Sequence, residues 1–245
     1  MKLRIALVEY LNTWPFSKGI TLSGLDQKFD FFHVPPAQCA ELFRRGEVDI
    51  SLCPVGALSG LPSHEVVGKY CIGADGPVET VMLLSKVPLA EITSVCLDDH
   101  SRTSNQLVQI LARDLWDTDW DFYFSEEGDA DTCLMIGDKV FAHRDRYPFH
   151  YDLASAWKSL TGLPMVFAVW VARPGIPREV MEALDDACSV GLQLLVMDEH
   201  QLEPWQFKYL TEKISYPMDD RKQIALKHFL KQSASLRVPL PQKQS

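Results

Sequence analysis

Residues 36–56, PAQCAELFRRGEVDISLCPVG, contain the pattern that decides the fold. Between Pro36 and Arg45, apolar residues recur at helical spacing, which predicts a helix with one buried face. These residues are Cys39, Ala40, Leu42 and Phe43. Gly46 is the residue type that most often ends a helix, and the apolar run Val48–Cys53 has the length of a buried strand. The pattern therefore predicts a helix followed directly by a strand of a covered sheet.

The rest of the chain repeats this alternation of short apolar strands and helical segments. Strands are predicted at 3–8, 29–34, 94–97, 120–124 and 132–136, and helices at 103–115, 152–160 and after Pro177. Such alternation is typical of an α/β protein with parallel sheets and helices on their faces. Two further apolar strands, 78–85 and 165–172, each lead into a break that contains proline.

The helix, the sequence Arg45–Ile50 and the strand after it resemble the type II periplasmic-binding-protein-like fold. That resemblance implies two α/β lobes, two crossing strands between them and a ligand in the cleft. The crossings would be 78–85 and 165–172. We therefore expect a discontinuous first lobe, residues 1–85 plus 173–245, and a second lobe, residues 86–172.

Composition and charge argue against several classes of function. The 245 residues carry a net charge of −9 and no basic stripe, so nucleic acid is not an expected partner. Six scattered cysteines without a CxxC pair predict reduced packing thiols, and the histidines have no metal-binding spacing. The chain begins directly with a strand and has no apolar run of membrane length. These features predict a cytoplasmic protein with no membrane partner.

The most ligand-like stretch is Leu97–Asn105, LDDHSRTSN, where a predicted strand runs into a helix. Ser101, Thr103 and Ser104 lie where a helix exposes unpaired N–H groups, and such a terminus favours anions. The alternative interpretation is plain N-capping by Ser101 or Thr103, which needs only one hydroxyl. Arg102 either clamps a carboxylate with its guanidinium or points to water.

Four more spots follow predicted strands, where α/β sheets gather their ligands. They are Tyr10-Leu11-Asn12, Pro54-Val55-Gly56, Gly76-Pro77-Val78-Glu79-Thr80 and Gly137-Asp138. Each spot alone is a weak signal, and simpler interpretations exist for Asn12 and Asp138 as helix caps and for Gly76-Pro77 as a turn. Trp157 and Trp170 lie in apolar periodic segments and are expected in the core. The acidic pairs Glu126-Glu127 and Asp185-Asp186 are expected to face solvent.

Taken together, the segments resemble the chorismate dehydratase family of the futalosine pathway of menaquinone biosynthesis. The resemblance covers residues 1–175 in order; beyond Pro177 only the helical character matches. The matching segments are Tyr10-Leu11-Asn12-Thr13, Gly46–Ile50, Pro54-Val55, Gly76-Pro77-Val78, Ser101–Ser104, Ile136-Gly137-Asp138, Tyr151-Asp152-Leu153 and Trp157…Thr161–Pro164…Phe167–Trp170. Thr80 keeps the hydroxyl of a position where the family has serine or threonine.

The resemblance implies a hydro-lyase that converts chorismate, a dicarboxylate, to 3-[(1-carboxyvinyl)oxy]benzoate without a metal or organic cofactor. The residues expected to be catalytic are Asn12, Thr80 and Asp138. The residues expected to bind substrate are Pro54, Val55, Gly76, Pro77, Val78, Ser101, Arg102, Thr103, Ser104 and Gly137.

The expected roles follow from the substrate's two carboxylates and its ring hydroxyl. Thr103 and Ser104, with their N–H groups, would bind one carboxylate, helped by Thr80 and the backbone near Val55. Asn12 would hydrogen-bond the departing hydroxyl or orient the enolpyruvyl arm. The carboxylates at strand exits, those of Glu79 and Asp138, have no recognisable activating partner in the sequence, so the substrate's own enolpyruvyl carboxylate is the hypothesised base. Two rivals stay open: a 1,4-dihydroxy-6-naphthoate synthase-like enzyme and a non-catalytic carboxylate-binding protein.

Overall fold

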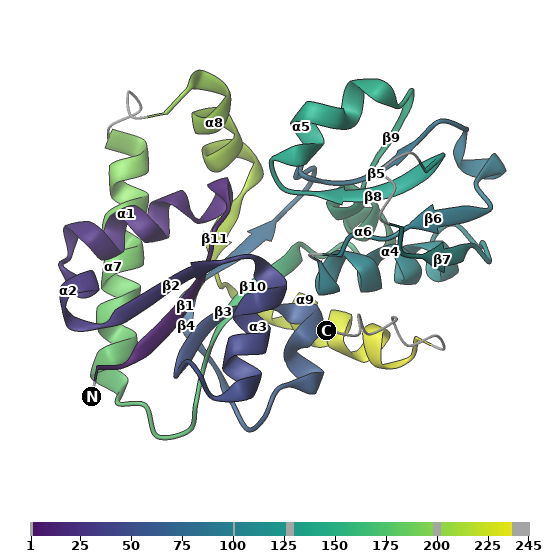
Figure 1. The fold of residues 1–245 in the computed structure, drawn as a ribbon. Coiled ribbons are helices and arrows are strands. Elements are labelled where there is room, and N and C mark those ends of the chain that lie inside the picture. The colour runs from purple at the N-terminus through teal and green to yellow at the C-terminus, as the bar shows by residue number, and fades with distance from the viewer. Residues whose placement is uncertain (1, 100, 126–129, 198–201, 237–245) are drawn as a thin grey trace.

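The computed structural model describes residues 2–99, 101–125, 130–197 and 202–236. Two β-sheets lie side by side in it (Figure 1). The first sheet contains β1 (Arg4–Val8), β2 (Asp30–Val34), β3 (Ile50–Pro54), β4 (Glu65–Ala74), β10 (Met165–Ala172) and β11 (Ser215–Pro217). The second contains β5 (Val81–Ser85), β6 (Ser94–Cys96), β7 (Asp121–Tyr123), β8 (Thr132–Ile136) and β9 (Phe149–Asp152). The strand orders are β11-β4-β10-β3-β1-β2 and β7-β6-β8-β5-β9.

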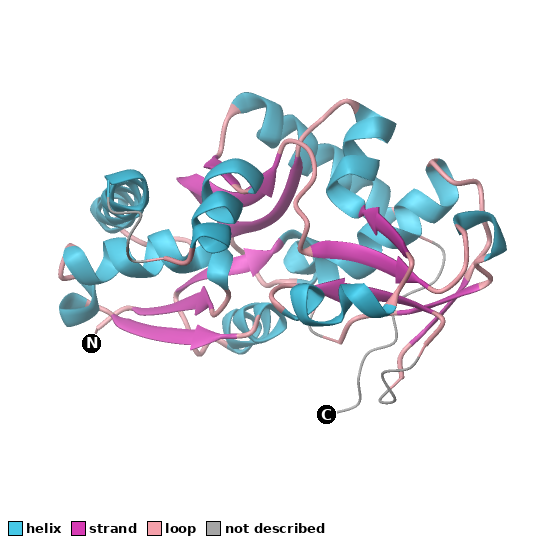
Figure 2. Cartoon of the chain, turned by 90° about the horizontal axis from the view of Figure 1, so that it is seen from above, coloured by secondary structure: helices cyan, strands magenta, loops and turns pink. Residues whose placement is uncertain are grey.

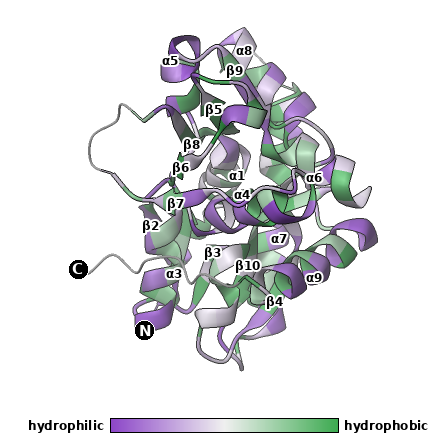
Figure 3. Ribbon diagram, turned by 90° about the vertical axis from the view of Figure 1, so that its right-hand side faces the viewer, coloured by the Kyte–Doolittle hydropathy of each residue, from purple (hydrophilic) through white to green (hydrophobic). Residues whose placement is uncertain are grey.

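Helices cover the sheets, and each sheet with its helices is called a lobe below (Figure 2). The first lobe has α1 (Trp14–Leu22), α2 (Leu25–Lys28), α3 (Pro36–Arg45), α7 (Arg178–Met197), α8 (Pro204–Lys208) and α9 (Asp220–Ala234). The second has α4 (Arg102–Asp114), α5 (Lys139–His143) and α6 (Leu153–Thr161). Hydrophilic and hydrophobic residues mix along these helices, as along α9 in Figure 3, which is typical of helices with one buried face.

The 36–56 stretch forms α3 and β3 as predicted. Gly46 ends α3 in the left-handed conformation, with φ of 80°, which glycine adopts without steric cost. Asp49 then accepts hydrogen bonds from the Arg4 backbone N–H at 2.9 Å and from the Arg4 guanidinium. This contact aligns β3 beside β1, and the two strands run parallel. Both strands therefore end at the same edge of the sheet, where the candidate site lies.

The chain passes between the sheets twice. It leaves the first sheet after Ala74 and enters the second at Val81, then returns after α6 to β10 at Met165. By strand pairing, β5 belongs to the second sheet and β10 to the first. The lobe boundaries expected from the sequence are 85/86 and 172/173. The chain changes sheet one strand earlier in each case, before β5 and before β10.

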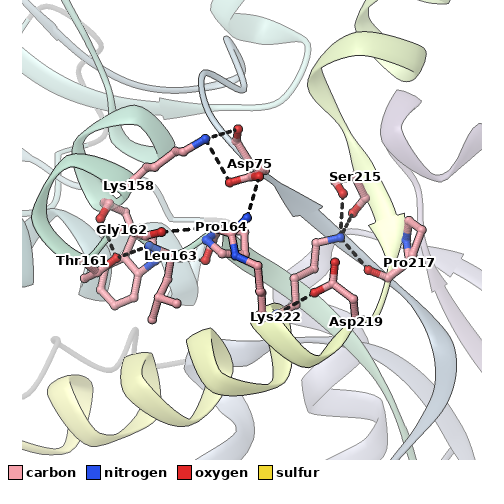
Figure 4. Close-up of polar contacts among 12 residues, drawn as sticks. Asp75, Lys158, Thr161, Gly162, Leu163, Pro164, Ser215, Pro217, Asp219 and Lys222 are labelled. Atoms are coloured by element: carbon pink, nitrogen blue, oxygen red, sulfur yellow. Dashed lines mark hydrogen bonds and ion pairs between the residues drawn. The ribbon is translucent and has the colours of Figure 1, made fainter.

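Charged residues tie the two connections to the C-terminal helix. The Asp75 carboxylate, on the first connection, lies 3.1 Å from the Lys158 ammonium on α6 (Figure 4). It also lies 3.2 Å from the Arg221 guanidinium on α9. Arg221 also donates to the carbonyl oxygen of Gly162 on the second connection, at 3.0 Å. All three charged side chains are partly exposed, so these pairs contribute little stability individually. Their placement nevertheless links both connections to one helix.

Close packing of α1 on α7 sets the position of the chain just after β1. A Cβ on Gly19 would lie 1.8 Å from the Ala187 carbonyl oxygen, and one on Gly191 would lie 1.7 Å from that of Pro15. Only glycine allows the two helices to approach so closely. Because α1 begins two residues after Asn12, this packing also fixes where the turn that carries Asn12 lies.

The core contains most of the residues that the sequence predicts there. All six cysteines are buried and free, as expected, and the Trp157 and Trp170 side chains are fully buried. The expectation for Asp185 is wrong: this side chain is only 8% exposed. Its carboxylate accepts the Lys69 backbone N–H at 2.7 Å, beside an irregular stretch of β4. Glu126-Glu127 lies outside the described residues.

Candidate functional site

A pocket lies between the two lobes, where the ends of β1, β3 and β8 meet the start of α4. About 580 Å³ of empty space lies within it, a volume that includes the part open to solvent. Its lining residues are Val8, Tyr10, Asn12, Pro36, Pro54, Ile72, Thr80, Val81, Ser101, Thr103, Ser104, Ile136, Gly137, Phe167, Ala168 and Ile214. Among the described residues, no charged side chain lines it. The polar groups available to a ligand are therefore neutral hydroxyls, amides and backbone N–H groups.

Asn12 lies in a tight turn and is one of the residues that line the pocket. The Thr13 hydroxyl donates to the carbonyl oxygens of Val8, at 2.5 Å, and Tyr10. The hydroxyl of Tyr216, on β11, donates to the Asn12 carbonyl oxygen at 3.0 Å. The Asn12 Oδ1 is buried and has no hydrogen-bond partner among the described residues. A buried acceptor without a partner is unfavourable, so this atom is suited to receive a donor from a ligand.

Thr80 is positioned from several sides at the point where the chain enters β5. Its hydroxyl oxygen lies 2.8 Å from the Tyr209 hydroxyl, and its carbonyl oxygen accepts the Gly137 N–H at 2.8 Å. The Asp152 carboxylate accepts the N–H groups of residues 78 and 79, at 2.9 and 2.7 Å. Burial raises the pKa of Asp152, and those N–H groups oppose the rise. The result is a Thr80 hydroxyl held at the wall of the pocket.

Tyr209 contacts Thr80 and was missed by sequence reasoning. Its side chain is 4% exposed, and it begins the π-helical turn Tyr209–Lys213. Its hydroxyl oxygen lies 2.8 Å from the Thr80 hydroxyl oxygen, and the two groups share a hydrogen bond. Burial is the main cause that raises the pKa of Tyr209, so the hydroxyl is neutral near pH 7. No local motif marks this position.

At the start of α4 the hydroxyls are used differently from the expectation. The Ser101 hydroxyl accepts the Ser104 N–H at 3.0 Å and caps the helix. The Thr103 hydroxyl donates to the Phe167 carbonyl oxygen and accepts the Gly56 N–H, each at 3.1 Å. The Thr103 side chain thus joins the lobes, and one lone pair of its oxygen is left. The groups that remain for an anion are the uncapped backbone N–H groups and the hydroxyl hydrogens of Ser101 and Ser104.

Asp138 contacts the opposite lobe beside the pocket. Burial raises the pKa of Asp138, and the nearby Leu11 backbone N–H opposes the rise. The Tyr10 ring packs within 3.3–3.6 Å of where a Cβ on Gly137 would lie. Burial, and then the carboxylates of Asp98 and Asp138, raise the pKa of Tyr10 to about 12. Residues 10–11 of one lobe therefore meet 137–138 of the other.

The structure brings many of the expected residues together, but not all. The expected residues that line the pocket are Asn12, Pro54, Thr80, Ser101, Thr103, Ser104 and Gly137. Those not among the lining residues are Val55, Gly76, Pro77, Val78, Arg102 and Asp138. The Arg102 side chain is exposed, and Val78 is buried. Sequence reasoning missed the apolar lining from β1, β4, β5, β8 and β10, because any buried strand has similar residues.

Metal-binding clusters and membrane-spanning helices are both absent from the described residues. No group of three or more His, Cys, Asp or Glu side chains there is arranged to hold a metal ion. In the same part of the chain, no helix combines the length and apolar character needed to cross a bilayer.

Comparisons with known proteins identify relatives of this chain. The model of a family described as menaquinone biosynthesis matches residues 3–235. A curated chorismate dehydratase from Thermus thermophilus is 27% identical over 252 residues, which span 85% of this chain and 89% of that protein.

Solved structures resemble this chain in fold. A protein of Archaeoglobus fulgidus superposes with a TM-score of 0.73 at 14% identity, covering 96% of this chain and 97% of that one. A Candida albicans protein, described as having the generic periplasmic binding protein fold, gives 0.65 at 11% identity, covering 98% and 92%. At these identities only the fold is informative, and it confirms the two-lobed fold predicted from the sequence.

Proposed function

The chain belongs to the menaquinone-biosynthesis family, and from this premise we propose that it is a hydro-lyase that converts chorismate to 3-[(1-carboxyvinyl)oxy]benzoate and water. The similarity to a chorismate dehydratase supports this reaction. The observation that carries the proposal is the interlobe pocket itself. It offers a partnerless amide oxygen, several hydroxyls and a helix N-terminus, with no charged side chain among its described lining residues.

The start of α4 receives one of the two carboxylates. The helix has 13 residues, so its N-terminus carries a partial positive charge and unpaired N–H groups. Ser101 caps only the Ser104 N–H. The hydroxyl hydrogens of Ser101 and Ser104 and the earlier N–H groups of the helix bind the anion. Neutral donors are sufficient here because hydrogen bonds to an ionised acceptor are stronger than those between neutral groups.

Asn12 and Thr80 hold the hydroxyl that leaves the ring. The Asn12 Oδ1 accepts the hydrogen of that hydroxyl, which satisfies the otherwise partnerless oxygen. The Thr80 hydroxyl donates to the oxygen of the same group, and this hydrogen bond strengthens as hydroxide character develops. Together the two side chains orient the carbon–oxygen bond that breaks and stabilise the departing oxygen.

The proton comes from the ring carbon next to the one that carries the hydroxyl. No described residue of the lining has a carboxylate or imidazole to take it. The enolpyruvyl carboxylate of the substrate, attached to that carbon through the ether oxygen, is held in reach and takes the proton. The electron pair of the broken C–H bond forms the new ring double bond as hydroxide departs, and hydroxide leaves as water once protonated. The product ring is aromatic, which makes the reaction favourable.

The test is incubation of the purified protein with chorismate, followed by proton NMR. The proposal expects loss of the cyclohexadiene signals and growth of aromatic signals of the vinyl ether product, at a rate proportional to protein concentration. Chorismate that binds but stays unchanged over hours would instead identify a binding protein. If the protein neither binds nor converts chorismate, the naphthoate-forming reaction becomes the next candidate.

A further inference from the structure

Phe167 is partly exposed, whereas the other seven residues of its strand, β10, are buried. Strands β3 and β4 flank β10 in the sheet, and the Phe167 carbonyl oxygen accepts the Thr103 hydroxyl. Little of the backbone is therefore left accessible at this position, and the exposed surface belongs mainly to the ring. Since Phe167 is among the residues that line the pocket, the pocket is the space that this surface faces.

An irregularity in the sheet explains why this side chain lies on the pocket face. In the pairing of β10 with β4, Val166 is opposite Gly73. The next pair is Ala168 with Ile72, which leaves Phe167 as an extra residue. Such a β-bulge sets two residues of one strand against one residue of its partner. The two residues here, Phe167 and Ala168, both line the pocket together with Ile72, whereas Val166 does not. In a regular strand, neighbouring side chains would point to opposite faces.

The bulge also places Phe167 beside the end of α4 that receives a carboxylate in the proposed reaction. Its carbonyl oxygen lies 3.1 Å from the Thr103 hydroxyl oxygen, and Thr103 is the second residue of the helix. One carboxylate of chorismate is attached directly to the ring. A carboxylate bound at this helix end therefore brings the ring next to Phe167 and leaves the enolpyruvyl carboxylate for the proton transfer.

The described lining contains two aromatic residues, Tyr10 and Phe167, among mainly aliphatic ones. Tyr10 packs at the contact between the lobes, against Gly137. Phe167 is thus the aromatic side chain that the pocket offers to a ring. Aromatic rings attract one another more than their buried area accounts for, in offset or edge-to-face arrangements. This attraction grows as the cyclohexadiene ring of the substrate becomes aromatic, so it favours the course of the reaction.

We propose that Phe167 is a specificity-determining residue, whose ring contacts the ring of the bound acid and favours its aromatic form over a non-aromatic one. The inference rests on the proposed dehydration for the identity of that ring. It rests on the bulge and the pocket for the position of Phe167. Aromatic diacids that resemble the product should therefore bind more tightly than saturated diacids of the same charge.

Isothermal titration calorimetry with two probes tests this preference. The aromatic probe is 3-(carboxymethoxy)benzoate, and the saturated probe is cis-3-(carboxymethoxy)cyclohexanecarboxylate, which has the same two carboxylates and ether oxygen. We expect wild type to bind the aromatic probe about 3- to 10-fold more tightly. In Phe167→Leu, affinity for the aromatic probe should fall by about the same factor, and affinity for the saturated probe by less than about twofold, because only the ring contact is lost.

Phe122→Leu is the matched control. Phe122, on β7, is also partly buried against the core but is not among the lining residues, so this variant should keep the wild-type preference. A merely structural role of Phe167 would weaken both probes equally in Phe167→Leu, and that result would overturn the inference. An unchanged preference in Phe167→Leu, or equal affinity of wild type for the two probes, would also overturn it.

Turnover of chorismate separates this inference from the proposed function. A wild-type protein that leaves chorismate unchanged but shows the Phe167-dependent preference rejects the dehydration and keeps Phe167 as a contact for the ring of another acid. Turnover without any preference between the probes rejects the ring contact and keeps the dehydration. Where both hold, Phe167→Leu should lower kcat/KM for chorismate by about 3- to 10-fold.

Discussion

The Thr103 hydroxyl, at the start of α4 in the second lobe, donates to the Phe167 carbonyl oxygen on β10 of the first lobe at 3.1 Å. The same hydroxyl accepts the Gly56 N–H at 3.1 Å. A Cβ on Gly56 would lie 2.8 Å from backbone atoms of residues 102 and 103, so the backbones are in close contact here. One side chain thus fixes how the anion-binding end of α4 faces the pocket.

Thr103→Val should therefore destabilise the protein. The valine has nearly the same shape but leaves the Gly56 N–H and the Phe167 carbonyl without this partner, at a cost of about 1–3 kcal/mol. Urea unfolding measures the change, and Thr103→Ser, which keeps the hydroxyl, is the matched control. Equal stability of the valine variant and wild type would mean that the contact between the lobes contributes nothing.

Asn12→Ala should lower kcat for chorismate by about 100-fold or more, because the departing hydroxyl loses the acceptor that orients it. Circular dichroism melting should show that the fold persists, since the turn is held by the backbone carbonyl of Asn12 and the hydroxyl of Thr13. A variant that turns over as fast as wild type would remove Asn12 from the mechanism.

Asp138→Asn separates a base in the substrate from a base in the protein. Asparagine keeps the size and an acceptor oxygen of the aspartate and Asp138 is not among the lining residues, so we expect kcat within about tenfold of wild type. Loss of a general base would instead lower the rate by about 10²–10⁴-fold. Complete loss of turnover with chorismate binding intact would assign the proton transfer to Asp138 and reject the substrate-assisted route.

Asp185→Asn should raise the unfolding free energy near pH 7. Burial is the largest cause that raises the pKa of Asp185 in the folded state, so ionisation is less favourable folded than unfolded. Its contribution to stability is therefore greatest below the ordinary carboxyl pKa and is lost as pH rises through the folded value. The asparagine can keep the hydrogen bond to the Lys69 N–H without the charge.

Unfolding curves of Asp185→Asn and wild type across pH 3–8 test this sign. We expect the two proteins to converge at the acid end and to diverge as the pH increases. A variant that is less stable than wild type at pH 7, by an amount that persists at low pH, would show that the carboxylate hydrogen bond outweighs the burial of charge.

Much of the secondary structure could be predicted because its signals are local. The helix before Gly46 and the strand after it appear in the structure as α3 and β3. Ser101 caps α4, as one of the two interpretations of the sequence predicted. Asp185 was misjudged because an acidic pair on a helix usually faces solvent, whereas here the irregular β4 brings the Lys69 N–H to it.

The candidate site was only partly predictable, because only some of its signals are local. The strand-exit rule placed Asn12, Thr80 and the start of α4 together, because the ends of neighbouring strands meet at one edge of a sheet. It did not separate residues that line the pocket from neighbours such as Arg102, whose side chain points to solvent. Backbone direction within a turn decides that difference, and residue type alone does not specify it.

The sequence by itself determined an α/β chain with a hydroxyl-rich set of strand exits, since both depend on periodicity and residue type within a few positions. The two crossings between sheets were implied by the resemblance to a known fold. Only the tertiary structure decided that Thr103 joins the lobes and that Tyr209 lies against Thr80, 129 positions earlier in the chain. Contacts of that separation depend on how two sheets and a C-terminal turn pack together, and no local pattern carries that information.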